Sequence, residues 1–172
     1  MIDQDTSRQF VTLGLGDELF AIPVALVREI LDMQKPFLIP EAPAHLVGLI
    51  DVRGQAVPVI DLRRKLGLPA KAATAETRIL VLAVPRDGSE LALGLIADRV
   101  IEVTALDEGS LSSAPQIGTR WRSDYIQAIG RRNGGFVVVF DLARLLASDA
   151  AALLQTPEAR PPAAAEAAVS CA

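Results

Sequence analysis

The sequence predicts an all-β protein with short helices, organised as two packed, five-stranded β-barrel subdomains followed by a C-terminal helix. Short runs of Val, Leu and Ile recur along the chain and are separated by Gly, Asn, Asp and Pro, as expected for strands and turns. A strand–turn–strand–helix unit occurs twice. About five strands are expected in each half, and closing such a small sheet into a barrel is the usual way to hide its edges.

The composition is that of a globular protein without a surface for nucleic acid. Hydrophobic residues make up 51% and charged residues 22% of the 172 residues, which is enough to form a buried core. Aromatic residues amount to only 4%, which disfavours base-stacking platforms. The formal net charge of −4 provides no positive field to attract phosphates. We therefore expect no nucleic-acid partner.

Several features favour a cytoplasmic protein. Residues 1–5 lack the positive start and apolar run of a signal peptide. The apolar runs are far shorter than the ~20 residues that cross a bilayer as a helix, so we expect no direct membrane insertion. Cys171 is the only cysteine, which excludes an intramolecular disulfide and fits a reducing compartment.

The first strands are predicted as a hairpin of residues 10–15 and 19–22, because both runs favour β-structure and a Gly-Asp-Glu turn separates them. Pro23 ends the second strand. A short amphipathic helix is expected next, from aliphatic residues at three- and four-residue spacing: Val24, Val27, Ile30 and Leu31. The prolines of segment 36–43 then predict an irregular connection.

A second hairpin is predicted at residues 46–52 and 55–60. The Arg53-Gly54 pair between these runs forms a tight turn, with the glycine at a position that favours positive φ. Asp61 follows as the expected N-cap of a helix of about one turn at residues 62–66.

The second half resumes the strand pattern. Strands are predicted at 78–84, 91–96, 100–103, 125–131 and 136–140. A long loop is expected at 106–122, and Asn133-Gly134-Gly135 is typical of a hairpin turn. Asp141 is the expected cap of a last helix at 142–154, and the Ala/Pro-rich tail at 156–172 is expected to be disordered.

An internal repeat relates the two halves. Residues 57–66 and 137–146 are identical at six of ten positions, and the hairpin glycines Gly54 and Gly134 fall in the same register. Strand, capping aspartate and short helix therefore recur as one unit.

A weaker echo relates Val27-Arg28-Glu29-Ile30 to Val100-Ile101-Glu102-Val103. We predict one domain over residues 9–155, made of two related, intertwined subdomains whose boundary falls near 70–77.

From about residue 9 to residue 146, the chain resembles the CheW family. The matching motifs, in order, are Phe10-Val11-Thr12-Leu13-Gly14-Leu15-Gly16-Asp17-Glu18-Leu19-Phe20-Ala21-Ile22-Pro23, Val27-Arg28-Glu29-Ile30, Ile39-Pro40, Ala42-Pro43, Val47-Gly48-Leu49-Ile50-Asp51-Val52-Arg53-Gly54 and Val57-Pro58-Val59-Ile60-Asp61-Leu62-Arg63. The Arg-Gly turn followed by Val-Pro-Val-Ile-Asp-Leu-Arg is the most specific of them. Two features depart from the family: Asp51 stands where an Asn is usual, and the C-terminal tail is longer.

The resemblance implies a non-enzymatic adaptor made of two five-stranded SH3-like barrels, without a cofactor or a metal. The cytoplasmic tip of a methyl-accepting chemoreceptor would dock in the groove between the barrels, and the regulatory domain of a CheA-type histidine kinase would bind beside it. By matching motif, Val27, Glu29 and Arg53 are expected to bind the receptor, and Gly48 is expected on the kinase-binding surface.

Each of these residues also has a purely structural interpretation. Arg53 can be a solvated turn residue, because surface ion pairs contribute little. Glu29 can be the polar side of the predicted helix, and the spacing of Val27 favours a core position. The sequence leaves these alternatives open.

An unrelated β-barrel enzyme or ligand carrier is the main functional alternative. His45 is the only histidine, and no serine is marked as its catalytic partner. Asp61 and Asp141 fit helix caps better than an acid–base pair. The sequence leaves open which receptor and kinase are the partners and which output the pathway controls.

Overall fold

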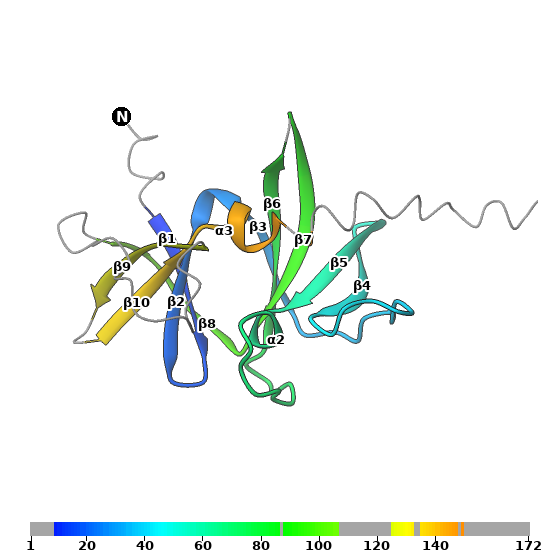
Figure 1. Ribbon diagram of the computed structural model, residues 1–172, viewed down its shortest axis with the longest axis horizontal. Helices are drawn as coiled ribbons and strands as arrows, with labels where there is room; N and C mark the ends of the chain where they lie inside the picture. The colour runs from blue at the N-terminus through cyan, green and yellow to red at the C-terminus, as the bar shows by residue number, and fades with distance from the viewer. Residues whose placement is uncertain (1–8, 87, 107–124, 133–134, 148, 150–172) are drawn as a thin grey trace, which may run out of the picture.

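The computed structural model consists mainly of β-strands (Figure 1). It describes residues 9–86, 88–106, 125–132, 135–147 and 149. The strands are β1 (Gln9–Leu15), β2 (Glu18–Pro23), β3 (Val27–Asp32), β4 (Leu46–Val52), β5 (Gln55–Asp61), β6 (Arg78–Arg86), β7 (Ser89–Ala97), β8 (Arg99–Ala105), β9 (Ile126–Arg132) and β10 (Gly135–Phe140). The helices are the 3-10 turn η1 (Val24–Leu26), α2 (Leu62–Lys65) and α3 (Leu142–Leu145). The predicted all-β class with short helices is confirmed.

The strands form two five-stranded sheets that lie side by side (Figure 1). Their strand orders are β8-β1-β2-β10-β9 and β3-β6-β7-β5-β4. Neighbouring strands are antiparallel except for the parallel pairs β2/β10 and β5/β7. The prediction of closed barrels is wrong, because neither sheet closes on itself. One open edge is protected in another way: the backbone of Phe37 pairs with Leu49 on the free side of β4.

The two sheets exchange strands. β3 follows the β1–β2 hairpin along the chain but pairs with β6 of the other sheet. β8 follows the β6–β7 hairpin but pairs with β1. Each sheet therefore contains strands from both sides of segment 70–77, two from one side and three from the other.

The internal repeat is confirmed in three dimensions. In each copy, an aspartate where the strand ends accepts a hydrogen bond from a helix backbone N–H: Asp61 from Arg63 at 3.0 Å, and Asp141 from Arg144 at 3.2 Å. The backbone N–H groups of the two aspartates donate to equivalent carbonyls 80 positions apart, those of His45 and Tyr125, both at 2.8 Å.

The weaker echo also corresponds to equivalent structure, but the helix predicted through Val27 and Leu31 is wrong. Only η1 is helical, and the remainder is strand β3. A register shift lies between Val27 and Glu29 in β3. The same shift occurs in β8 between Val100 and Glu102, which pair with Leu13 and Thr12. Such a bulge interrupts the two-residue alternation of apolar side chains, which explains why the segment has a helix-like spacing.

Among the residues that the structure describes, three apolar clusters stabilise the fold. The largest fills the space between the sheets, where the rings of Phe20 and Phe140 stack at 4.9 Å and the apolar residues of α2 and α3 pack. A smaller cluster belongs to each sheet, around Val137 and Val139 in one and around Val57 and Ile79 in the other. The predicted loop beyond residue 106, the helix beyond residue 149 and the tail at 156–172 lie outside the described residues.

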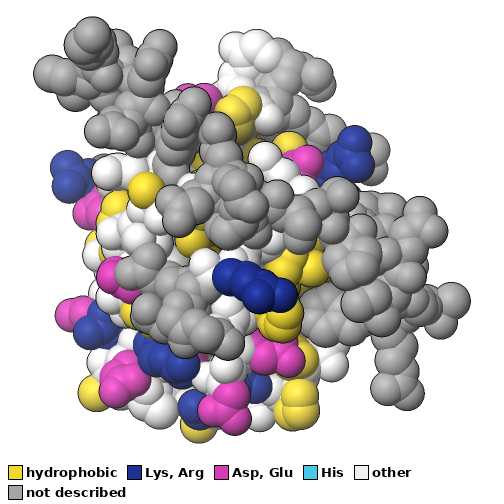
Figure 2. Space-filling model, turned by 90° about the vertical axis from the view of Figure 1, so that its left-hand side faces the viewer, with side chains coloured by type: hydrophobic (Ala, Val, Ile, Leu, Met, Phe, Trp, Pro, Cys, Tyr) yellow, Lys and Arg dark blue, Asp and Glu magenta, His cyan; other side chains and the backbone are white. Residues whose placement is uncertain are grey.

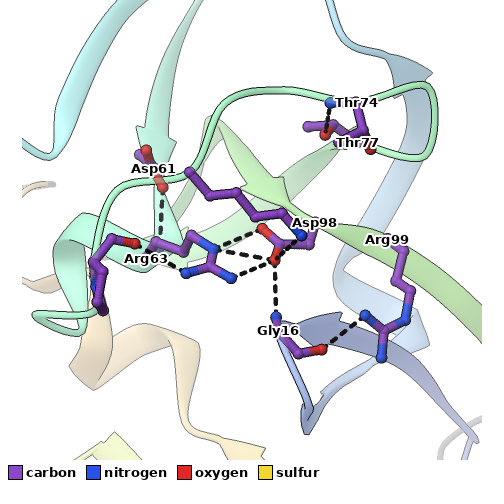
Figure 3. A network of polar contacts seen from close by, with 9 residues as sticks. Gly16, Asp61, Arg63, Thr74, Thr77, Asp98 and Arg99 are labelled. Carbon is purple, nitrogen blue, oxygen red and sulfur yellow. Dashed lines mark hydrogen bonds and ion pairs between the residues drawn. The ribbon is translucent and has the colours of Figure 1, made fainter.

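A polar clamp joins the two sheets at one end of the central core (Figure 3). Arg63 of α2 donates to Asp98, with Nη2–Oδ2 and Nε–Oδ1 distances of 2.6 and 2.8 Å. Asp98 also accepts from the backbone N–H of Gly16 at 2.8 Å, and Arg99 donates to the Gly16 carbonyl at 2.8 Å. The Arg63 hydrogen bonds hold the pKa of Asp98 below its usual value, although burial opposes this shift.

We expect Asp98→Asn to lower the free energy of unfolding by about 3 kcal/mol at pH 7, because it leaves the guanidinium, only 13% exposed, without its counter-ion. Since the Asp98 pKa is lowered in the folded state, this contribution is present above the unfolded pKa of ~3.9 and is lost as the pH falls through the folded value. Urea titrations at pH 7 and at pH 3 measure both effects.

The control is Glu90→Gln, which breaks an ion pair to Arg28 whose side chains are more than half exposed. This change should cost no more than about 1 kcal/mol. Equal losses in the two variants would show that the Arg63–Asp98 clamp is not a stabilising contact.

Candidate functional site

A groove of ≈ 320 Å³ opens on the sheet that contains β3 and β5. Its apolar lining continues the small cluster of that sheet and includes Val52, Val57, Val81, Ala83 and Ala92. Its rim carries four charged side chains: Arg28, Glu29, Arg53 and Glu90. An apolar floor with a charged rim is typical of a surface that binds a protein segment.

The bulge in β3 delivers two adjacent charges to this groove. Because the register shifts between Val27 and Glu29, Arg28 and Glu29 both line the groove instead of pointing to opposite faces of the sheet. Arg28 Nη2 donates to both carboxylate oxygens of Glu90, at 2.9 and 3.0 Å. This ion pair spans from β3 across β6 to β7.

Glu29 and Arg53, both predicted from the sequence, meet on the same rim. Arg53 Nε lies 3.3 Å from Glu29 Oε2, and Nη2 donates to Oε1 at 3.4 Å. The arginine side chain is 82% exposed, whereas that of Glu29 is 27% exposed. Such a long, solvated contact contributes little to stability, so the guanidinium is available to another carboxylate.

The turn that carries Arg53 is tight and locally unfavourable. Arg53 and Gly54 both have positive φ, 54° and 83°, as a two-residue hairpin turn of type I′ requires. Asp51 Oδ1 accepts from the Gly54 N–H at 2.8 Å. An Asn side chain has the same acceptor oxygen, so Asp51 fits the position where the resemblance to the CheW family predicts an Asn.

We expect Arg53→Asn to leave the free energy of unfolding unchanged or to raise it by up to about 1 kcal/mol, because Asn tolerates the left-handed conformation better than Arg. Thermal or urea unfolding measures this difference. A loss of more than 1 kcal/mol would mean that the Glu29 contact contributes more to stability than the turn strain costs.

Val27 does not join this groove. It pairs with Leu82, and its partly buried side chain packs against the central core on the other face of β3. Ile30 is 41% exposed and pairs with Leu80, which belongs to the same core. In the other sheet, Val103 is 53% exposed and pairs with the core residue Val11. The structure therefore separates the three predicted receptor-binding residues into a charged groove and an apolar edge between the sheets.

Gly48 lies below a loop backbone instead of on an open surface. A Cβ atom at this position would lie 2.1 Å from the carbonyl oxygen of Phe37. That close approach allows Phe37 and Leu49 to exchange two backbone hydrogen bonds of 2.8 Å. The loop then presents Phe37 and Leu38 with 76% and 79% of their surface exposed. These two residues were missed from the sequence, although adjacent large apolar residues in a proline-rich connection are a usable signal.

We expect Gly48→Ala to destabilise the fold by about 1–3 kcal/mol or to open the Phe37–Leu49 bridge, because the added methyl group meets backbone that cannot move independently. Amide hydrogen exchange at Phe37 and Leu49 measures the opening. Gly54→Asn is the control, since no atom lies within 4 Å of a Cβ at Gly54 and Asn tolerates positive φ. Normal protection of both amides in Gly48→Ala would contradict this role.

Other features of the described residues bear on the alternative functions. They contain no group of three or more His, Cys, Asp or Glu that could hold a metal ion. No helix among them has the length and apolar character needed to cross a membrane. His45 contacts Asp149, and both capping aspartates are engaged by helix backbone. Figure 2 shows a face on which acidic and basic side chains are interspersed, so charges of one sign do not dominate it.

Comparisons with known proteins agree on one family. The family model described as CheW-like domain matches residues 9–150. The chain is 30% identical over 148 residues to the chemotaxis protein CheW of Treponema pallidum, covering 86% of this chain and 87% of that protein. It is 33% identical over 111 residues to CheW of Bacillus subtilis, covering 64% and 69%. Among solved structures, the scaffolding protein TtCheW from Thermoanaerobacter tengcongensis matches with a TM-score of 0.73 at 27% identity, covering 81% and 88%.

Proposed function

The chain belongs to the CheW family of chemotaxis proteins, and we propose that it is a non-enzymatic adaptor that couples chemoreceptors to a CheA-type histidine autokinase. The observation that carries this proposal is the family match over residues 9–150, which includes every described element. A relative with the same fold is named a scaffolding protein. Exposed apolar residues on two separate regions fit a protein that holds two partners.

The receptor side is proposed to include Val27, Glu29 and Arg53. The partner would be the cytoplasmic tip of a methyl-accepting chemoreceptor. The long contact between Glu29 and the highly exposed Arg53 supports this assignment, because a partner carboxylate can replace Glu29 at low cost. The half-exposed Ile30 on the same strand as Val27 adds apolar surface at the edge between the sheets.

The kinase side is proposed to include Gly48 together with Phe37 and Leu38. Two adjacent side chains that are more than three-quarters exposed offer an apolar contact to the regulatory domain of the kinase. Gly48 acts by allowing the close backbone approach that presents them. With these two partners, the protein would be located in the cytoplasm and recruited to membrane-associated receptor arrays.

We expect Arg53→Glu to keep the fold and to weaken assembly with receptor and kinase by about 2–5 kcal/mol, because it removes one interfacial charge contact and adds repulsion. A ternary binding assay with a receptor tip and a kinase regulatory domain measures the loss.

The matched control is Arg144→Glu on α3, where the exposed arginine lies outside the groove. An ordinary surface substitution should change the affinity by no more than about 0.5 kcal/mol. Unaltered affinity in Arg53→Glu would remove this residue from the binding site.

A further inference from the structure

A buried carboxylate near the C-terminal end of the described chain contacts the loop that leads into β4. Asp149 is 7% exposed, and its Oδ1 accepts a hydrogen bond from Nε2 of His45. Its Oδ2 lies 2.7 Å from Nζ of Lys65 in α2, as an ion pair without hydrogen-bond alignment. The side chains of His45 and Lys65 are 24% and 15% exposed. Three segments that are distant in sequence therefore meet at one carboxylate.

The loop that ends at His45 contains a strained residue. Glu41 has a φ of 62°, a conformation that a residue with a side chain rarely adopts. Such strain persists only where the surrounding structure holds the backbone in place. The Phe37–Leu49 bridge fixes the first end of the loop. The second end is held by Arg64, which donates to the Ala44 carbonyl at 3.0 Å, and by the contact between His45 and Asp149.

The internal repeat shows that the position of His45 is used as an anchor in both halves. Its equivalent is Tyr125, whose backbone carbonyl accepts the same hydrogen bond. The Tyr125 ring packs on Phe140, with centroids 6.3 Å apart. One half therefore anchors this position through aromatic packing, and the other half anchors it through a carboxylate from the C-terminal segment.

We propose that Asp149 is a positioning residue for the kinase side: by fixing His45, it holds loop 37–45 in the conformation that presents Phe37 and Leu38. The identity of the partner in this inference, the kinase regulatory domain, rests on the proposed function. The loop conformation itself can be tested without the partner.

The first measurement is amide hydrogen exchange along the whole chain. Asp149→Ala and His45→Ala should each accelerate exchange in loop 37–45 about tenfold or more, since a hydrogen bond to a charged group is lost. The double variant should add little, because both changes remove the same contact. His45→Gln, which retains a side-chain N–H donor, should stay closer to the parent protein.

An internal reference region and a control variant distinguish a positioning role from general destabilisation of the fold. Exchange in the central β6–β7 hairpin reports opening of the whole fold and should stay nearly constant. Asp32→Ala, which changes an aspartate with a 91% exposed side chain, is the control and should alter neither region. His45→Ala keeps the Lys65–Asp149 ion pair, so it provides the test if Asp149→Ala does not fold. Uniform acceleration along the chain, or unchanged exchange in the loop, would overturn the proposal.

The second measurement is the affinity for the regulatory domain of a CheA-type kinase. Asp149→Ala and His45→Ala should each weaken binding about tenfold, whereas His45→Gln, which keeps an N–H donor for Asp149, should keep most of the affinity. Faster loop exchange with unchanged affinity would overturn the link between Asp149 and the partner. If the parent protein itself does not bind the kinase domain, the proposed function fails, while the exchange data still decide whether Asp149 holds the loop.

Discussion

The exchange of β3 and β8 between the sheets is the constraint on which the remaining structure depends. Each sheet contains strands from both halves of the chain, so the two halves cannot separate without breaking backbone pairing in both sheets. The central core and the Arg63–Asp98 clamp reinforce the same junction. A fixed junction suits a scaffold, because two proposed partner surfaces on different edges then keep one relative position.

Local patterns predicted most of the elements, and nonlocal pairing explains the failures. The hairpins, both capping aspartates and the internal repeat are encoded in short stretches of sequence, so turn chemistry and two-residue alternation were sufficient. In contrast, the bulge at Arg28 disturbs that alternation, and β3 was predicted as a helix. Barrel closure and strand exchange depend on which edges meet in space, and no local pattern specifies that choice.

The candidate site was predictable to a similar extent. The structure brings Glu29 and Arg53 together, as the motifs indicated, but it places Val27 on the opposite face of β3. Glu90 and Asp149 could not be found, because each becomes informative only through a partner 62 or 104 residues away in the chain. The φ of Arg53 is a different case, since an arginine before the glycine of a tight turn is already unusual in sequence.

Local strain in this protein lies beside the proposed partner surfaces. Among the described residues, the non-glycine residues with positive φ are Glu41, in the loop between Leu38 and His45, and Arg53, at the rim of the groove. Gly or Asn would fit either backbone better, but neither carries a long charged side chain. At the turn, the strained conformation places a guanidinium where most of it is exposed. A fold held by exchanged strands can tolerate a residue that its own turn disfavours, because the energy that fixes the sheets comes from elsewhere.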